Sequence, residues 1–348
     1  MFDVRRKADD GTVTSKEVAP QKVKSVWMGR GTMLSAEAVR LALQHNVDIV
    51  FLESSGQPLG RVWHSKLGST TLIRKRQLEA SMDERALRYT LAWIGQKLDN
   101  QAELLRDLKK HRTQHGDYLN EKIGQLAELR GKVAGLTLKE GWENTVQGLE
   151  GTAGRLYFEA LSAVLLPPWQ FAGRSSRPAQ DPFNAFLNYA YGVLYARTEK
   201  ALMLAGADPF VGFLHRDGYN LKSMAFDFIE PYRIWADKTV FSLFSAKKVN
   251  QSHYETGAAR AASGVSAKPG PKVAANANHL GIFVNSEGKK LLMEAFNAYL
   301  EADTLRYKGR NRTRMGILLL DAHRFAQELL TGSGVGSETE LELDITEL

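Results

Sequence analysis

The sequence contains no cysteine among its 348 residues. Disulfide bridges, thiolate zinc sites and cysteine nucleophiles are therefore excluded. A chain of this length can bury an ample core without such cross-links, and the lack of cysteine fits a reducing cytoplasm. The HExxH motif of zinc proteases, the GxxxxGK[ST] phosphate loop and the GxSxG nucleophile elbow are also missing. The chemistry of this chain must therefore rest on other residues.

Long apolar runs are missing as well. No stretch approaches the ~18 apolar residues of a membrane span, and the first residues, MFDVRRKADDGTV, lack the apolar core of a signal peptide. We therefore expect a cytoplasmic protein with no membrane contact. The net charge is +7, although residues 332–348 carry five acidic side chains and no Lys or Arg. The remaining, strongly basic body favours a polyanionic partner, while charge alone is equally explained by solubility.

The composition changes along the chain and predicts two domains. Residues 1–65 read as a small, mostly β domain, with one helix that Ser35 can cap. Residues 66–80 are expected to be a linker, and 81–331 an α-helical catalytic domain. Within this domain, residues 247–281 are polar and rich in Gly and Ala, which predicts a mobile loop. After it, residues 332–348 are predicted to be a disordered acidic tail. The expected strands are Val13–Ala19, Lys22–Met28 and Val47–Glu53, and the expected helix is Ala36–His45.

Apolar side chains spaced by three, four and seven residues predict the helices of the second domain. Leucine and isoleucine recur in this way from Leu87 to Leu108, so one face of a long helix is expected to face the core. Weaker patterns predict further helices over Tyr118–Lys132, Glu140–Leu165, Pro182–Ala205, Leu221–Phe244, Lys289–Leu305 and Arg312–Thr331. The fold class is therefore α+β.

Two isolated residues of this domain are candidates for chemistry. Glu159 lies in the apolar segment GRLYFEALSAVL, so its carboxylate is expected to face a cavity or a partner. His215 lies in DPFVGFLHRDGYN, a segment punctuated by Gly and Asp between two helices, and loops often carry functional residues. Each residue taken alone is also explained by a structural or surface role.

The segment FDFIEPYR places two carboxylates together. Asp227 and Glu230 are three residues apart and project from one helical face within apolar surroundings. Like charges in such surroundings need a cation between them. Arg233, one turn further, can provide it as a salt bridge, and a metal ion is the alternative. Pro231 is expected to kink the helix or to start a new one.

One imidazole and two or three carboxylates form a ligand set without sulfur. Hard oxygen ligands favour Mg²⁺ or Mn²⁺, and a single imidazole favours Mn²⁺. The sequence therefore predicts a divalent metal site, with His215 and two or three of the carboxylates Glu159, Asp227 and Glu230 as candidate ligands.

Four segments together resemble the CRISPR-associated integrase family, the larger subunit of the spacer-acquisition complex. GFLHRDGYNLKSMAFDFIEPYR resembles the His motif of the family and its Ser-Leu-x-x-Asp-Leu-x-Glu-x-x-Arg helix, which fall on His215, Ser223, Asp227, Glu230 and Arg233. GRLYFEAL resembles its Glu motif, DPFNAFLNYAYGVLYA its Asn helix, and the segment from Gly29 to Val62 its small domain. The resemblance spans residues 2 to 331.

The resemblance implies an N-terminal β-sandwich-like domain followed by an α-helical catalytic domain. It also implies that Glu159, His215 and Glu230 bind the metal, with Asp227 as a further catalytic carboxylate. Supporting roles fall on the matching polar residues of the two motif helices, namely Asn184, Asn188, Ser223 and Arg233.

The activity that the resemblance implies is metal-dependent DNA integration and endonuclease cleavage. The 3′-hydroxyl of a short double-stranded DNA would attack a phosphodiester at the edge of a repeat array. The chain would act as a homodimer, with two such dimers around a dimer of a small CRISPR-associated partner protein. Basic residues near the domain junction and before the Asn helix are expected to hold DNA phosphates, namely Arg74, Arg76, Arg85, Arg174 and Arg177.

Two alternatives remain open. A mobile-element integrase of the same fold, of the casposon type, would act without the small partner. Such relatives often carry an extra DNA-binding domain, and none is expected after Thr331. A DNA-binding relative that has lost catalysis is the other alternative, which the presence of His215 and both predicted glutamate ligands disfavours.

Overall fold

The computed structural model describes residues 1–7, 12–23, 25–29, 31–45, 47–52, 58–62, 70–176, 178–215, 221–258 and 280–332. The chain divides into two compact units, whose described parts lie within residues 1–68 and 69–339. Among the described residues, no helix is long and apolar enough to cross a membrane.

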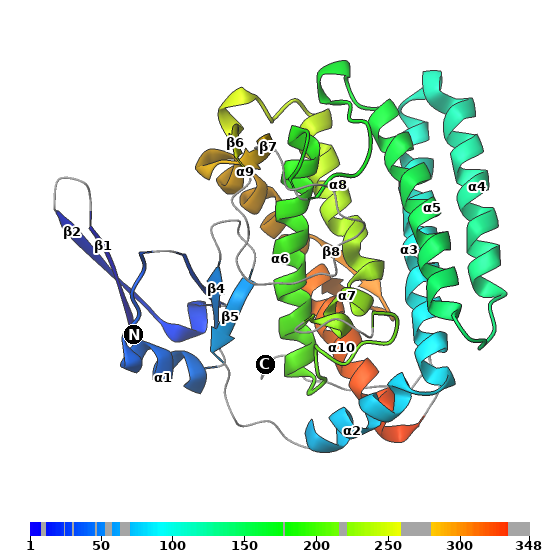
Figure 1. The fold of residues 1–348 in the computed structure, drawn as a ribbon. Coiled ribbons are helices and arrows are strands. Elements are labelled where there is room, and N and C mark those ends of the chain that lie inside the picture. Colours follow the sequence, from blue (N-terminus) through cyan, green and yellow to red (C-terminus); the bar gives the residue numbers. More distant parts are fainter. Residues whose placement is uncertain are drawn as a thin grey trace. The chain divides into compact units, whose positions relative to one another are not determined.

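The first unit contains two small sheets and one helix (Figure 1). Strand β1 (Phe2–Lys7) pairs antiparallel with β2 (Val13–Val18). In the second sheet, the middle strand pairs in parallel with one neighbour and antiparallel with the other. These strands are β3 (Ser25–Met28), β4 (Asp48–Leu52) and β5 (Pro58–Val62), and the helix α1 (Ala36–Gln44) precedes β4.

The local sequence explains this unit. Ser35 begins α1 as predicted, because its side chain accepts a hydrogen bond from the backbone amide of Ala38. Apolar side chains from both sheets and α1 then form one core, which includes Phe2, Met28, Ala42, Val47 and Ile49. The predicted strands and helix are confirmed to within a few residues.

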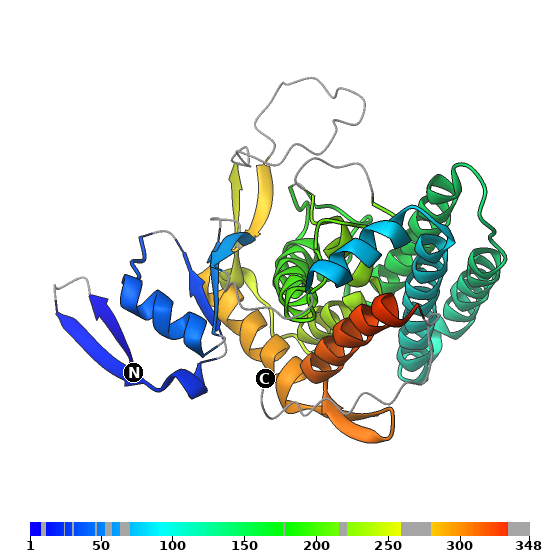
Figure 2. The same cartoon turned by 90° about the horizontal axis from the view of Figure 1, so that it is seen from below.

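The second unit is mostly helical. Its helices are α2 (Thr70–Ser81), α3 (Glu84–Lys110), α4 (Gly116–Ala134), α5 (Trp142–Ala163), α6 (Pro182–Leu204), α7 (Ser223–Phe228), α8 (Arg233–Ser245), α9 (Ser286–Asn297) and α10 (Arg314–Thr331). Helices α3, α4 and α5 pack side by side, and α6 packs against α8 and α10 (Figures 1 and 2). The predicted stripe on α3 is buried at Leu87, Ile94, Leu98, Leu105 and Leu108, as expected.

The helix predicted over 221–244 is broken where Pro231 stands, as predicted. Helix α7 ends at Phe228, a single 3₁₀ turn follows over Glu230–Tyr232, and α8 begins at Arg233. The side-chain amide of Asn100 on α3 donates to the carbonyl oxygen of Pro231 at 2.8 Å. The break is therefore held from a second helix, and it places Glu230 at the turn rather than within a regular helix.

Three predictions about the second unit need correction. Residues 66–80 are not simply a linker, because α2 begins at Thr70 and packs against α3 and α10. Gln77 of α2 is buried and binds the backbone at Asp208 and Val211.

The unit is also not entirely α-helical. Two antiparallel hairpins belong to it, formed by β6 (Tyr254–Ala258) with β7 (Leu280–Val284) and by β8 (Thr304–Tyr307) with β9 (Arg310–Thr313).

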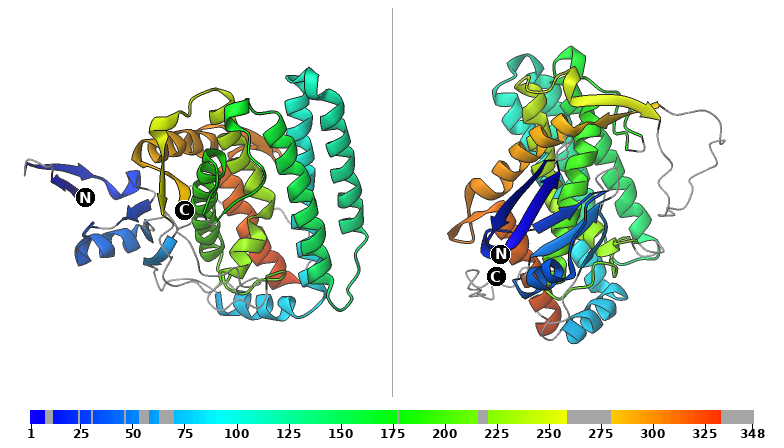
Figure 3. Two further views of the ribbon diagram at one scale, coloured as in Figure 1. Left: turned by 45° about the horizontal axis from the view of Figure 1, so that its top comes forward. Right: turned by 90° about the vertical axis from the view of Figure 1, so that its left-hand side faces the viewer.

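The first hairpin corrects the predicted loop at 247–281. Its strands form both ends of that segment, and β7 lies along α6 (Figure 3). Strand β6 escapes prediction because Tyr254–Ala258 is polar or small and shows no apolar alternation. Strand β7 is more apolar, but it begins only at Leu280, at the end of the predicted loop. Residues 259–279 and the tail from 333 lie outside the described residues, so the predictions for them stay predictions.

Candidate active site

The loop that carries His215 is fixed by the buried carboxylate of Asp227. One oxygen of Asp227 accepts the backbone amides of Phe213 at 2.6 Å and Leu214 at 2.8 Å. Its other oxygen lies 2.5 Å from Nδ1 of His215. These contacts fix Asp227, and Asp227 in turn orients the imidazole of His215. Nε2 of His215 is then the ring nitrogen that can bind a ligand.

The imidazole of His215 lies at the surface of the site, with 40% of its side chain exposed. Burial of the ring opposes its protonation, but the hydrogen bond to Asp227 and the negative charges of Asp227 and Glu230 together outweigh burial, so the pKa of His215 is raised. The backbone approaches closely here, because a Cβ at Gly212 would lie 2.5 Å from Cβ of Ser223. Ser223 is buried, so its contribution is the close packing of α7 against this loop.

Glu230 lies at the helix break, buried between two cations. One carboxylate oxygen accepts Nε of Arg233 at 2.9 Å, and the other accepts Nζ of Lys97 at 2.6 Å. Burial opposes ionisation of the carboxyl, but Arg233 and Lys97 outweigh it and lower the pKa of Glu230. The predicted salt bridge from Arg233 is therefore present, and Lys97 of α3 adds a second cation.

Lys97 also binds Glu150 of α5, so the two glutamates share one ammonium group. The side chain of Lys97 is only 9% exposed. Burial disfavours its charged form, yet Glu230 and Glu150 raise the pKa of Lys97. Elements far apart in sequence therefore bring Glu150, Glu230 and a permanent cation to one point.

Glu159, the ligand predicted from α5, does not lie with this group. Its carboxylate pairs with Lys122 of α4 at 2.8 Å, and its side chain is 41% exposed. Glu159 follows Glu150 by nine residues on one helix, which is about 13.5 Å along the axis and about half a turn around it. The described contacts therefore join Glu150 to Glu230, and they do not bring Glu159 together with His215 or Glu230.

A signal in the sequence could have identified Glu150. Val146, Glu150, Ala153 and Tyr157 are spaced by four, three and four residues, so they share one helical face. Val146, Ala153 and Tyr157 are fully buried. An acidic residue on the buried stripe of α5 must meet a partner in the core, whereas Glu159 lies off this stripe.

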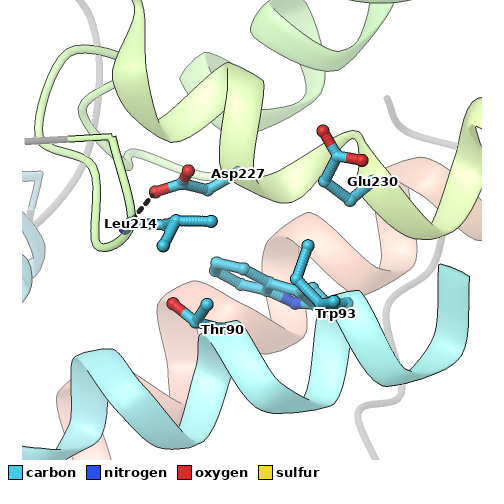
Figure 4. A pocket seen from close by; sticks show the side chains of 6 residues that line it. Thr90, Trp93, Leu214, Asp227 and Glu230 are labelled. Carbon is cyan, nitrogen blue, oxygen red and sulfur yellow. Dashed lines mark hydrogen bonds between the residues drawn. The ribbon is translucent and has the colours of Figure 1, made fainter. Parts of the chain in front are cut away.

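A small pocket separates the acidic residues from α3 (Figure 4). Asp227 and Glu230 lie on one side of it, and Thr90 and Trp93 of α3 lie on the other. The indole of Trp93 stacks on Phe213 with 5.9 Å between ring centroids. These apolar walls exclude water around the carboxylates, which strengthens every electrostatic interaction within the site.

Rings and polar side chains hold the two arginines next to the site. The guanidinium groups of Arg233 and Arg174 lie 4.9 Å and 5.3 Å from the ring centroid of Tyr191. The hydroxyl of Tyr191 donates to Asp237 at 2.6 Å, and burial raises the pKa of Asp237. Arg233 is therefore a fixed part of the site.

Asn184 and Asn188 bind the loop before α6. Both side-chain oxygens accept the guanidinium of Arg174, and both amide groups donate to backbone carbonyls of residues 173–176. Asp181 caps α6 through the backbone amide of Asn184 at 2.7 Å. The two asparagines thus position Arg174, which is the contribution that the described contacts give them.

Two of the other basic residues predicted to hold DNA form ion pairs within the chain. Arg76 pairs with Glu79 at 2.8 Å, and Arg85 pairs with Asp83 at 2.7 Å. Arg74 is half-buried on α2. Arg177 lies outside the described residues. The role of all five arginines toward DNA stays a prediction.

The residues around Lys97 fit a divalent cation by their chemistry. Within the described ranges, no three His, Asp or Glu side chains are close enough to form a ready metal site. The carboxylates of Glu150 and Glu230 nevertheless already converge on the positive charge of Lys97. Two carboxylates with the oriented imidazole of His215 give the hard, nitrogen-containing donor set that Mn²⁺ or Mg²⁺ accepts.

Comparison with known proteins points to one family. The profile of a family described as CRISPR associated protein Cas1 matches residues 2–268. The CRISPR-associated endonuclease Cas1 1 of Archaeoglobus fulgidus is 30% identical over 322 residues, which cover 88% of this chain and 86% of that protein.

Two solved structures share the fold. A casposase bound to an integration product superimposes with a TM-score of 0.74 at 19% identity, over 98% of this chain and 90% of that one. A structure described as a Cas6-RT-Cas1–Cas2 complex gives a TM-score of 0.73 at 20% identity. This chain is 95% covered there, but it spans only 33% of that longer chain.

Proposed function

Because the chain belongs to the Cas1 family of CRISPR-associated proteins, we propose that it is a metal-dependent DNA integrase and endonuclease that inserts spacers during CRISPR adaptation. One observation carries the proposal: Glu150 and Glu230 meet at a single cation, and Glu230 lies near enough to His215, which a buried aspartate orients, for their charges to interact. Such a site can serve the exchange of phosphodiester bonds without a covalent enzyme intermediate, which agrees with the lack of cysteine.

Glu150, Glu230 and Nε2 of His215 would hold Mg²⁺ or Mn²⁺ in this proposal. Glu150 replaces Glu159 as the ligand from α5, because only Glu150 shares a contact with Glu230. Bound there, a divalent ion supplies a positive charge that stabilises the negative charge developing on the phosphate. Asp227 holds the histidine in the orientation and tautomer that leave Nε2 for the ion.

The reaction itself exchanges one phosphodiester bond for another. The 3′-hydroxyl oxygen of the incoming DNA forms a bond to a phosphorus of the repeat, and the 3′-oxygen of the cleaved repeat strand leaves. The rate then depends mainly on how well the attacking 3′-hydroxyl and the phosphorus of the repeat are held in line. Arg174 is suited to a phosphate contact, since its guanidinium is held in place by Asn184 and Asn188 at an exposed loop.

A homodimer with a small CRISPR-associated partner is the proposed working assembly, with two such dimers around one partner dimer. A structural neighbour described as a Cas6-RT-Cas1–Cas2 complex supports a partner of the Cas2 type. The partner would set the distance between the two integration sites, while each active site acts on one DNA strand end.

A mobile-element integrase is the second candidate, and one finding favours it: a casposase bound to an integration product has the same fold. The two candidates differ in their need for the partner. A casposon-type integrase would join DNA ends equally well alone, whereas a spacer integrase would depend on the small protein.

An integration assay tests both. The purified chain is incubated with a labelled short duplex and a plasmid that carries a repeat array, with and without its partner protein, in Mn²⁺, Mg²⁺ or EDTA. The proposal predicts partner-stimulated strand transfer in a divalent ion and none in EDTA or with His215→Ala. Equal strand transfer in EDTA would overturn the metal-dependent reaction.

A further inference from the structure

Lys97 occupies the meeting point of the two glutamates. Its Nζ lies 2.6 Å from one oxygen of Glu230 and also binds Oε1 of Glu150, while the other oxygen of Glu230 is held by Arg233. The ammonium therefore stands between the two carboxylates that the proposed function assigns to a divalent ion. Lys97 is the ion-pair partner of Glu150 among the described contacts, and Arg233 also acts on Glu150 through its charge.

We propose that Lys97 is a built-in counter-cation that competes with the divalent ion for Glu150 and Glu230, so that metal binding at this site is an exchange of cations. The inference rests on the proposed function, because it takes the ligands from there. It assigns Lys97 as a positioning residue that also sets the affinity of the site for metal.

The two cations of the site differ in how easily they can withdraw. Arg233 is held by Tyr191 and Tyr195, whose ring centroids lie 4.9 Å and 5.3 Å from its guanidinium carbon. Lys97 carries a point charge on a flexible stem of four carbons, and the described contacts of its ammonium are the two glutamates. Arg233 is therefore suited to stay on Glu230, and Lys97 is suited to move when a stronger cation arrives.

Competition gives Lys97 opposite effects on folding and on metal binding. Glu230 is buried and Glu150 is partly exposed, and two carboxylates that meet at one point repel each other, so the ammonium of Lys97 stabilises the folded chain when no ion is present. The same positive charge opposes a second cation at these oxygens. Removal of the charge should therefore weaken the fold without metal and tighten metal binding.

Isothermal titration of the full chain with Mn²⁺, without DNA, measures this directly. Lys97→Met should bind Mn²⁺ about tenfold more tightly than wild type, which is the effect that one neighbouring charge has on proton affinity. Its melting temperature should fall in EDTA and rise more on addition of Mn²⁺. Lys97→Gln, which keeps a hydrogen-bond donor, provides a second neutral variant if Lys97→Met does not fold.

Lys122 supplies a matched control, because it is also a lysine with an 11% exposed side chain that pairs with a glutamate of α5. Lys122→Met should leave Mn²⁺ affinity unchanged. Unchanged or weaker affinity in the folded Lys97 variants overturns the competition. In that case the proposed function still holds if wild type binds Mn²⁺ and Glu230→Gln does not. A wild-type chain that does not bind Mn²⁺ overturns both.

Discussion

Glu150 of α5 and Glu230 of the helix break share one counter-ion, the ammonium group of Lys97. The contact joins three separate elements, and it locates the proposed chemistry on the buried stripe of α5 rather than at Glu159.

Replacement of Asp227 by asparagine should disable the histidine while the loop stays folded. The amide oxygen can still accept the backbone amides of Phe213 and Leu214. Its NH₂ group would meet Nδ1 of His215 as a donor, which forces the proton onto Nε2 and removes the lone pair that binds metal. We expect Mn²⁺ affinity to fall by about 10–100-fold.

Isothermal titration of Asp227→Asn measures that loss, and circular dichroism checks that the variant is folded. Asp321→Asn, a buried carboxylate of α10 outside the cluster, serves as the control and should keep its affinity. Wild-type affinity in Asp227→Asn would show that His215 needs no orienting carboxylate.

The loop before His215 should not tolerate a side chain at Gly212. A Cβ there would lie 2.5 Å from Cβ of Ser223 and 2.8 Å from the carbonyl oxygen of His215. Gly212→Ala is expected to lower the free energy of unfolding by about 1–3 kcal/mol, because packed backbone must move. Urea denaturation measures the change.

Gly151 on α5 provides the opposite case, because a Cβ there meets no atom within 4 Å among the described residues. Gly151→Ala should stabilise the chain by up to about 1 kcal/mol, since alanine favours a helix more than glycine does. Equal effects of the two substitutions would contradict the close packing at Gly212.

Removal of the charge from Glu230 should separate catalysis from DNA binding. Glu230→Gln leaves the cations of Lys97 and Arg233 without their shared carboxylate, so we expect a loss of stability of about 3 kcal/mol. Strand transfer should fall by at least about 100-fold, while fluorescence anisotropy shows DNA binding within a few-fold of wild type. Parallel losses of both activities would argue against a catalytic position.

The stability of the chain should depend on pH through Asp321. Its carboxylate accepts the hydroxyls of Tyr307 at 2.6 Å and Tyr232 at 2.9 Å, with Lys308 3.9 Å away and Arg324 nearby. Burial raises the pKa of Asp321 from 3.8 to about 6. The folded chain therefore binds this proton more tightly than the unfolded chain does.

Stability from this group is present below the unfolded pKa and is lost as pH rises toward about 6. Asp321→Asn cannot titrate, so the difference in free energy of unfolding, wild type minus variant, should fall by up to about 3 kcal/mol between pH 4 and pH 7. Urea denaturation at several pH values measures it. A difference that does not change with pH would contradict the raised pKa.

Much of the fold can be predicted from the sequence, because local physics determines it. The apolar spacing from Leu87 to Leu108 predicts α3, Ser35 predicts the start of α1, and Pro231 predicts the break that positions Glu230. Strand β1 escapes prediction, because Asp3, Arg5 and Arg6 make its sequence polar and its pairing with β2 comes from elsewhere in the chain.

The candidate site is predicted only in part, for a physical reason. His215, Asp227 and Glu230 lie close in sequence, so their motif can be recognised. Which glutamate of α5 enters the site depends on which face of that helix is buried. The aromatic residues Tyr157 and Phe158 beside Glu159 do not by themselves reveal that face. Lys97 is hidden within an ordinary helical sequence, because its buried position follows from the packing of α3 against the helix break.

A direct comparison of Glu150→Gln with Glu159→Gln tests whether Glu150, rather than Glu159, is the carboxylate of α5 that serves strand transfer. Both substitutions remove one carboxylate from α5 and one ion pair from a lysine, Lys97 or Lys122, although Lys97 keeps its contact with Glu230. Metal-dependent strand transfer is measured for each variant beside wild type, with DNA binding as the check on folding. The account predicts that Glu150→Gln abolishes strand transfer and that Glu159→Gln keeps it within a few-fold of wild type. Loss of strand transfer in Glu159→Gln with full activity in Glu150→Gln would contradict it.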